Sequence, residues 1–154
     1  VSGLHASASE MNRWAQQRFG VRAELVDHSG LGDASRITAG DMVKALVALG
    51  PQGRLAGLLK DIPMRNASYE VVKSDPNKVR AKTGTLNFVS SLAGYQRAPD
   101  GTELAFAIFC ADVPLRKKTA NANGDRPRGA RTYNGRAKRL QQSLLRRWGQ
   151  LYGA

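Results

Sequence analysis

The sequence predicts an α+β fold, in which an antiparallel sheet is flanked by helices. Two helical patterns with start and stop signals lie in the first 51 residues, an amphipathic helical pattern lies at the C-terminal end, and three β-capable runs, 79–85, 89–96 and 103–111, lie between them. A chain of 154 residues with 42% apolar residues can bury one core. We therefore expect residues 1–154 to fold as one unit or as part of one.

The first helix is expected over residues 9–19. Ser7 and Glu10 have the spacing of a capping box, and Gly20 supplies a stop signal. The apolar positions that recur at helical spacing are Met11, Trp14, Ala15 and Phe19. This pattern predicts an amphipathic helix, and we expect Trp14 to pack in a core.

An extended piece over 21–26 and a glycine-punctuated loop precede the second helix. Asp27, His28 and Ser29 in that loop hold the side chains of a hydrolytic triad. Neighbours in sequence point to different sides of the backbone, so they favour a polar turn instead.

The second helix is predicted to begin after Thr38, which forms a capping box with Asp41, and to end at Gly50-Pro51. A further short helix is expected over 55–60. The polar, turn-rich stretch 63–76 then predicts an irregular surface excursion.

The three β-capable runs predict the sheet. Pro99-Asp100-Gly101 favours a tight turn between the last two. Both alternating sets of side chains in 103–111 are apolar, which predicts a central strand covered on both faces. We therefore expect Phe106 and Phe109 to pack in the core, and Cys110 to behave as a small buried hydrophobe.

Positive charge is concentrated near the C-terminus. The chain has 24 Lys plus Arg against 12 Asp plus Glu, a net charge of +12, and 11 of the cations lie between Arg116 and Arg147. Residues 116–131 are rich in Gly, Pro and Asn and predict a long loop. An amphipathic helix follows, with apolar residues at Ala137, Leu140, Leu144, Trp148 and Leu151.

One function class suggested by this charge is a non-enzymatic basic module that binds polyanions, such as nucleic acid, acidic lipid or an acidic wall polymer, through Arg116 to Arg147. Nucleic acid is disfavoured, because this stretch and the residue after it hold only Tyr133 and Trp148 as aromatics, and no nucleic-acid fold signature is present.

Several other classes are excluded by composition. A single cysteine cannot form an internal disulfide, and two histidines without ligand spacing predict no metal site and no cofactor. No run of about 18 apolar residues predicts a membrane span, and no secretion signal is visible. Because the chain begins at Val1, we expect it to derive from something longer.

Lys82-Thr83-Gly84 ends a predicted strand whose hairpin partner follows directly. The longer stretch 79–95 resembles a strand pair of class C low-molecular-mass penicillin-binding proteins, the D-alanyl-D-alanine carboxypeptidase/endopeptidases. Residues 27–31 resemble the Asp-Gly-Ser-Gly-Leu loop of that family, with His28 in place of the first glycine, and Ile37-Thr38-Ala39 follows as in the family. The resemblance covers most of residues 9–151.

This resemblance implies a β-lactamase/transpeptidase-like fold, of which the chain would supply the C-terminal half. Lys82 would be the catalytic cation and Thr83 the ligand of the substrate carboxylate. Gly84 would permit close approach, the Thr85 amide would contribute to the oxyanion hole, and Asn87 would lie at the far end of the cleft. The implied partners are peptidoglycan D-alanyl peptides and β-lactams, and the implied location is the periplasm.

The family's two upstream motifs are absent from this chain. Neither Ser-x-x-Lys nor Ser-x-Asn occurs at any of its ten serines. Acyl transfer requires a nucleophile and a base within hydrogen-bond reach. We therefore expect residues 1–154 to be the C-terminal portion of one serine peptidase domain, to require its missing N-terminal part as partner, and to be inactive alone. Carboxypeptidase and endopeptidase activity stay open as alternatives.

Overall fold

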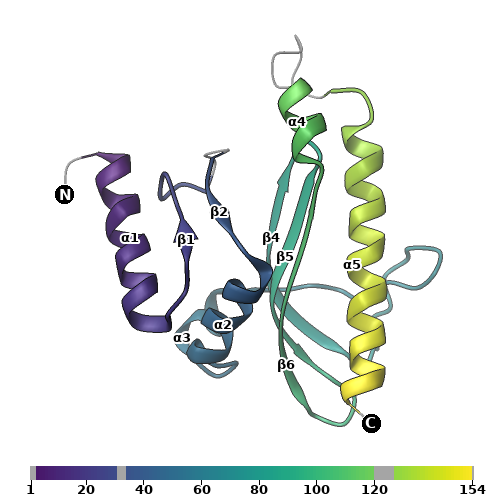
Figure 1. Ribbon diagram of the computed structural model, residues 1–154. Helices are drawn as coiled ribbons and strands as arrows, with labels where there is room; N and C mark the ends of the chain where they lie inside the picture. Colours follow the sequence, from purple (N-terminus) through teal and green to yellow (C-terminus); the bar gives the residue numbers. More distant parts are fainter. Residues whose placement is uncertain (1–2, 31–33, 120–126, 154) are drawn as a thin grey trace. The chain divides into compact units, whose positions relative to one another are not determined.

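The computed structural model of the chain describes residues 3–30, 34–119 and 127–153. The chain divides into two compact units, Val1–Gly50 and Pro51–Ala154. Figure 1 shows helices and antiparallel strands in both units, so the predicted α+β class is confirmed.

The first unit contains two helices and a small two-stranded sheet. The helix α1 spans Leu4–Phe19 and α2 spans Ala39–Leu49, whereas β1 (Ala23–Glu24) pairs antiparallel with β2 (Arg36–Ile37). The predicted short extended piece after the first helix is thus confirmed as β1.

The predicted start of α1 was wrong. The helix begins about one turn earlier, after Gly3, and no side chain caps it there. Instead Ser9 donates its hydroxyl to the carbonyl of His5, and Glu10 pairs with Arg13 within the helix. The end was predicted well, because Gly20 takes a left-handed φ of 62° and its N–H donates to the Gln16 carbonyl. The expected burial of Trp14 was also wrong, since its side chain is 55% exposed.

The N-cap predicted at Thr38 is confirmed, and Asp41 is its side-chain partner. Thr38 is the N-cap, its Oγ accepts a 3.0 Å bond from the Asp41 N–H, and it donates a 2.9 Å bond to the Asp41 carboxylate. Gly50 closes the helix by donating its N–H to the Leu46 carbonyl. Both signals act through local hydrogen bonds, which is why sequence spacing alone located them.

The loop before β2 is a polar turn, as predicted. One carboxylate oxygen of Asp27 accepts from the N–H of Ser29, the hydroxyl of Ser29 and the N–H of Gly30. Ser29 therefore donates to Asp27 rather than to His28, and this is not a hydrolytic relay. Residues 31–33 of the loop lie outside the described residues.

The second unit is built on a four-stranded antiparallel sheet of order β3-β4-β5-β6. The bounds are Lys60–Asp61 for β3, Lys78–Leu86 for β4, Val89–Arg97 for β5 and Glu103–Ala111 for β6. Its helices are α3 (Arg54–Leu58), α4 (Val113–Thr119) and α5 (Ala130–Tyr152). The three long strands and the short helix were predicted to within one or two residues at each end. The Asp100-Gly101 turn is also confirmed.

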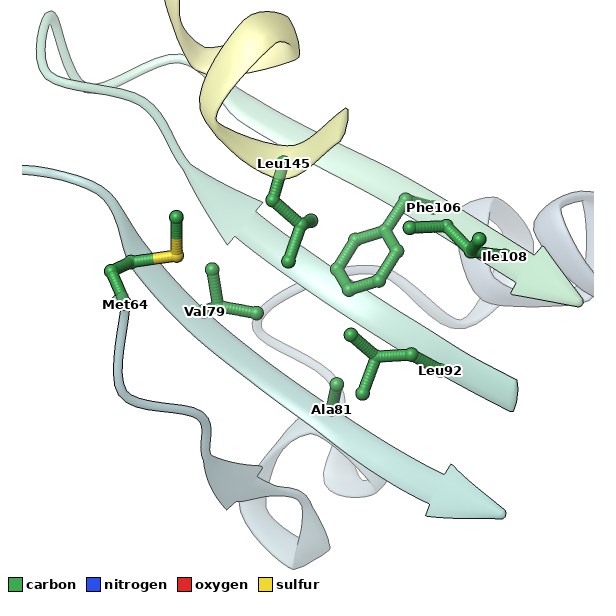
Figure 2. Packing of buried hydrophobic residues seen from close by; sticks show 7 residues of the cluster. All are labelled: Met64, Val79, Ala81, Leu92, Phe106, Ile108 and Leu145. Carbon is green, nitrogen blue, oxygen red and sulfur yellow. The ribbon is translucent and has the colours of Figure 1, made fainter. Parts of the chain in front are cut away.

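The core of this unit lies between the sheet and α5. Figure 2 shows Leu145 of α5 directed at side chains from β4, β5 and β6, with Met64 beside Val79. The cluster consists of Met64, Val79, Ala81, Leu92, Phe106, Ile108 and Leu145. The segment 63–76 was predicted to run over the surface, but Met64 near its start is 2% exposed and belongs to this core.

The position predicted for the last strand was wrong. Within the described residues β6 pairs only with β5 and forms an edge of the sheet. Its two faces also differ, because Phe106 is 3% exposed under α5 whereas Phe109 is 37% exposed. Apolar composition on both faces therefore did not mean that both faces were covered.

The buried stripe of α5 also differs from the predicted one. Of the predicted stripe, Ala137 is buried and Leu144 and Trp148 pack against the core, but Leu140 and Leu151 are about half exposed. The helix also buries Gln141, Leu145 and Gly149, which the pattern did not predict. Gln141 donates to the carbonyl of Ser90, which satisfies its buried amide. Of the predicted basic loop 116–131, residues 116–119 belong to α4 and residues 120–126 lie outside the described part.

A buried polar cluster joins α5 to the sheet. The Gln96 amide donates a 3.0 Å bond to the Asn77 side-chain oxygen and a 2.8 Å bond to the Leu145 carbonyl. Asn77 in turn donates to the Asp75 carboxylate. Gly149 leaves the space for this cluster, because a Cβ at that position would lie 2.7 Å from the Gln96 nitrogen.

Candidate functional site

The Lys-Thr-Gly triplet lies in the second half of β4. Cross-strand register places Lys82 opposite Ala93, Thr83 opposite Leu92 and Gly84 opposite Ser91. The side chains of Lys82 and Thr83 are exposed, and so is that of Thr85. Side chains alternate along a strand, so Lys82 lies on the opposite sheet face from the two threonines.

The outer edge of β4 is open beside the triplet. The short strand β3 pairs only with Arg80 and Ala81, and no strand in the described part of the chain continues that pairing toward Leu86. The Ile62 N–H donates to the Val79 carbonyl across this edge at 2.8 Å. In an antiparallel ladder every second residue points both backbone groups to the same side. The N–H and C=O groups of Thr83 and Thr85 therefore face the open edge.

One of these edge groups already has a partner. The Lys82 ammonium donates a 2.6 Å hydrogen bond to the Thr83 carbonyl, within an exposed environment. This bond is charge-assisted, and it places the exposed ammonium along the edge of the strand. The ammonium and the two threonine backbones thus lie along one short segment of strand.

The Ser91 side chain on β5 occupies the space beside Gly84. A Cβ at this position would lie 2.5 Å from the Ser91 hydroxyl oxygen, and that hydroxyl is within 3.4 Å of the Gly84 carbonyl. The close approach that the sequence analysis expected at Gly84, by a substrate or by the opposing wall of the cleft, stays a prediction.

The hairpin turn after the triplet consists of Asn87 and Phe88. Phe88 has a left-handed φ of 58°, which is unusual for a bulky residue. Its ring is 1% exposed and meets the Tyr133 ring edge-on at 6.0 Å, and its carbonyl accepts from the Asp112 N–H. Asn87 is half-buried and its carbonyl lies 3.3 Å from the Arg116 guanidinium.

Three residues that support this turn were missed by the sequence analysis, namely Phe88, Arg116 and Asn134. Asn134 of α5 donates a 2.9 Å bond to the Leu86 carbonyl, and thereby fixes the end of β4. These contacts span 29 and 48 positions along the chain, and no local sequence pattern signals them. Nearby, burial raises the pKa of Tyr133, with smaller contributions from Cys110 and Asp112.

The arrangement can bind an extended chain and a negative charge. An open strand edge offers backbone groups to an added strand, and an exposed ammonium and two hydroxyls offer partners to a carboxylate. Ser90 and Ser91 on the neighbouring strand are engaged with Gln141 and Gly84, respectively. No group of three or more His, Cys, Asp or Glu side chains that could hold a metal occurs among the residues described.

Comparison with known proteins identifies the class. The D-Ala-D-Ala carboxypeptidase 3 (S13) family matches residues 6–127, which include the whole β4–β5 hairpin. Because this match covers most of the chain, the chain belongs to that family. No curated protein sequence matches it significantly.

A similar fold occurs in a solved structure, a predatory endopeptidase from Bdellovibrio bacteriovorus in complex with an immunity protein. The TM-score is 0.56 at 20% sequence identity, over 91% of this chain and 37% of the endopeptidase. The chain thus spans little more than a third of that structure. None of the helices in the described residues is long and apolar enough to cross a membrane.

Proposed function

We propose that this chain is part of a penicillin-binding serine D-alanyl-D-alanine carboxypeptidase/endopeptidase of class C that acts on peptidoglycan peptides in the cell envelope. The observation that carries the proposal is the open edge of β4 beside exposed Lys82 and Thr83. Membership of the D-Ala-D-Ala carboxypeptidase 3 family supports it.

In this proposal the hairpin is one wall of the active site. An extended acyl-D-alanyl peptide adds to the edge through the backbone groups of Thr83 and Thr85. The Lys82 ammonium supplies positive potential, the Thr83 hydroxyl binds the terminal carboxylate, and the Thr85 N–H contributes to the oxyanion hole. Gly84 keeps the strand close to Ser91, and Asn87 adds a polar group at the end of the cleft.

The reactive hydroxyl and its base come from elsewhere in the full protein. We propose that this chain corresponds to the C-terminal part of the catalytic domain and that the nucleophile motif lies upstream. The 154-residue chain alone should therefore bind no β-lactam covalently, because acyl transfer requires both groups. A fluorescent penicillin that labelled this chain by itself would contradict the proposal.

Replacing Lys82 in the full-length protein tests the assignment. Lys82→Ala is expected to lower the rate of acylation by a fluorescent penicillin by about 100-fold, because it removes a preorganised positive group from the site. Lys73→Ala is the matched control, since Lys73 is an exposed lysine outside the hairpin. An acylation rate that is unchanged in Lys82→Ala would remove the assignment.

A further inference from the structure

A basic groove lies between α5 and the 63–72 segment, within the second unit. Its volume is about 510 Å³, and four arginines line it, namely Arg65, Arg139, Arg146 and Arg147. No acidic residue is among the described residues that line the groove. Nothing in the proposed peptidase function uses these residues.

The two walls of the groove are held together by hydrogen bonds. The Gln142 side-chain oxygen accepts a 3.0 Å bond from the Arg65 N–H, and its nitrogen donates to the Pro63 carbonyl at 3.3 Å. Arg146 donates to the Arg65 carbonyl from the same helix. Met64, the residue between Pro63 and Arg65, is buried in the core. The groove is therefore a fixed feature and not a gap between loose side chains.

Two of the guanidinium groups, those of Arg65 and Arg139, contact the same aromatic ring. Arg65 and Arg139 both lie over the Tyr69 ring, at 4.8 Å and 5.0 Å from its centroid. Arg65 in addition donates a 2.7 Å bond to the Tyr69 carbonyl. Both guanidinium carbons therefore lie within about 5 Å of one ring centroid, and N–H groups at their rims are still able to donate.

Little negative charge of the protein offsets these four cations. Within the described residues, Asp75 is the only acid in ion-pair range, 3.9 Å from Arg146. Arg139 and Arg147 are exposed and have no ion-pair partner there. Like charges held close together repel, so a multivalent anion in the groove would stabilise the arrangement.

The number of guanidinium groups favours phosphate over carboxylate. A planar carboxylate is satisfied by a single guanidinium fork, whereas a phosphate group offers more oxygens and up to two charges, which several arginines can share. We propose that this groove binds a compact ligand that carries two or more linked phosphate groups. This site is distinct from the β4 edge and does not depend on the proposed peptidase function.

Tripolyphosphate binding to the 154-residue chain, measured by calorimetry, tests the proposal. Arg139→Gln combined with Arg147→Gln removes two groove cations. Arg131→Gln combined with Arg136→Gln is the matched control, because it removes the same charge from exposed positions of the same helix outside the groove. The groove variant should bind about tenfold more weakly or worse, and the control should bind within about twofold of the unsubstituted chain.

Three outcomes would overturn the proposal: no binding by the unsubstituted chain, equal weakening in the two double variants, or equal binding of the tricarboxylate tricarballylate. Equal weakening would indicate diffuse attraction to the +12 chain. Thermal unfolding of both variants shows whether they are folded. Cosedimentation with phosphatidylcholine vesicles, with and without diacylglycerol pyrophosphate, distinguishes a lipid headgroup from a free ligand as the source of the phosphate groups. Groove-dependent vesicle binding tighter than tripolyphosphate binding would support a lipid headgroup, and binding of tripolyphosphate alone would support a free ligand.

Discussion

At Gly94, backbone atoms of the β4–β5 hairpin leave no room for a side chain. A Cβ at this position would lie 2.6 Å from the Ala81 Cα and 2.9 Å from its Cβ, and would also clash with the Arg80 carbonyl. These are mostly backbone atoms, so the neighbouring strand could not move aside without disturbing its pairing. Lys82 follows Ala81 directly, and the geometry of the candidate site thus depends on this glycine.

Gly94→Ala is expected to lower the free energy of unfolding by about 3 kcal/mol, the upper range for overpacking. Urea denaturation of both proteins measures the difference. Gly57→Ala is the matched control, because no atom lies within 4 Å of a Cβ there and Gly57 is in the helix α3. The control should change stability by no more than about 1 kcal/mol. Equal losses in the two variants would show that crowding is not the cause.

Asp100 in the β5–β6 turn should make stability depend on pH. Hydrogen bonds from the Thr102 hydroxyl and N–H lower the pKa of this carboxyl below its ordinary value of 3.8. A lowered pKa in the folded state means that the charged carboxylate stabilises the fold above that ordinary value, and that the contribution is lost as the pH falls through the lowered pKa.

We therefore expect Asp100→Asn to lower the melting temperature at pH 6, and the difference from the unsubstituted chain to shrink progressively below about pH 4. Thermal unfolding followed by circular dichroism across this range measures it. A difference that stayed constant down to pH 2 would contradict the expected linkage.

At the scale of single elements, the two capping boxes of the sequence had different outcomes. Thr38 and Asp41 exchange hydrogen bonds at the start of α2, whereas Ser7 lies within α1 and caps nothing. The spacing is the same in both cases. Because α1 begins about one turn before the predicted start, Ser7 lies inside the helix and not at its N-terminus.

Thr38→Ala should therefore lower stability by about 1 kcal/mol, the usual cost of losing an N-cap. Ser7→Ala, its matched control, should change stability by no more than about 0.5 kcal/mol. Both values can be measured by urea denaturation. If the two substitutions had the same cost, the assignment of Thr38 as the cap would fail.

Local sequence patterns predicted where the sheet strands begin and end. They did not predict which strands lie next to each other. Alternation and the Asp100-Gly101 turn located β5 and β6 to within about one residue. The position of β6 at the edge depends on which other strands are present, and this is not encoded in its own nine residues. Similarly, a buried stripe containing Gln141 and Gly149 appears polar and helix-breaking until its partners on the sheet are known.

In the candidate site, too, local features could be predicted from the sequence and features that depend on distant residues could not. Exposure of Lys82 and Thr83 on a strand that continues into a hairpin could be predicted from the sequence. The left-handed Phe88, supported by Tyr133 and Asp112, could not be, because its strain is offset by burial among distant residues. The roles of these residues in catalysis stay predictions.

At the scale of the whole molecule, the two units differ in how much they bury. Every member of the large hydrophobic cluster lies between Met64 and Leu145, within the second unit. In the first unit the described buried apolar residues are Ala8, Val21 and Leu46. The second unit therefore holds a core of its own, and the first holds little.

A chain of residues 51–154 should therefore fold without the first 50. We expect cooperative thermal unfolding and a near-ultraviolet circular dichroism spectrum from its packed aromatic residues. Residues 1–50 alone should lack both signals. A non-cooperative transition in the 51–154 chain would show that its core depends on the first unit.

The bond between the Lys82 ammonium and the Thr83 carbonyl makes occupation of the strand edge a competition. That carbonyl oxygen has two lone pairs, so an incoming backbone N–H either shares it with the ammonium or replaces the ammonium, and a replaced ammonium loses its partner. In the proposed function, a peptide that ends in a free carboxylate supplies a new partner, whereas an amidated peptide of the same sequence supplies none. On that proposal the edge would favour chain ends over chain interiors before any covalent chemistry begins.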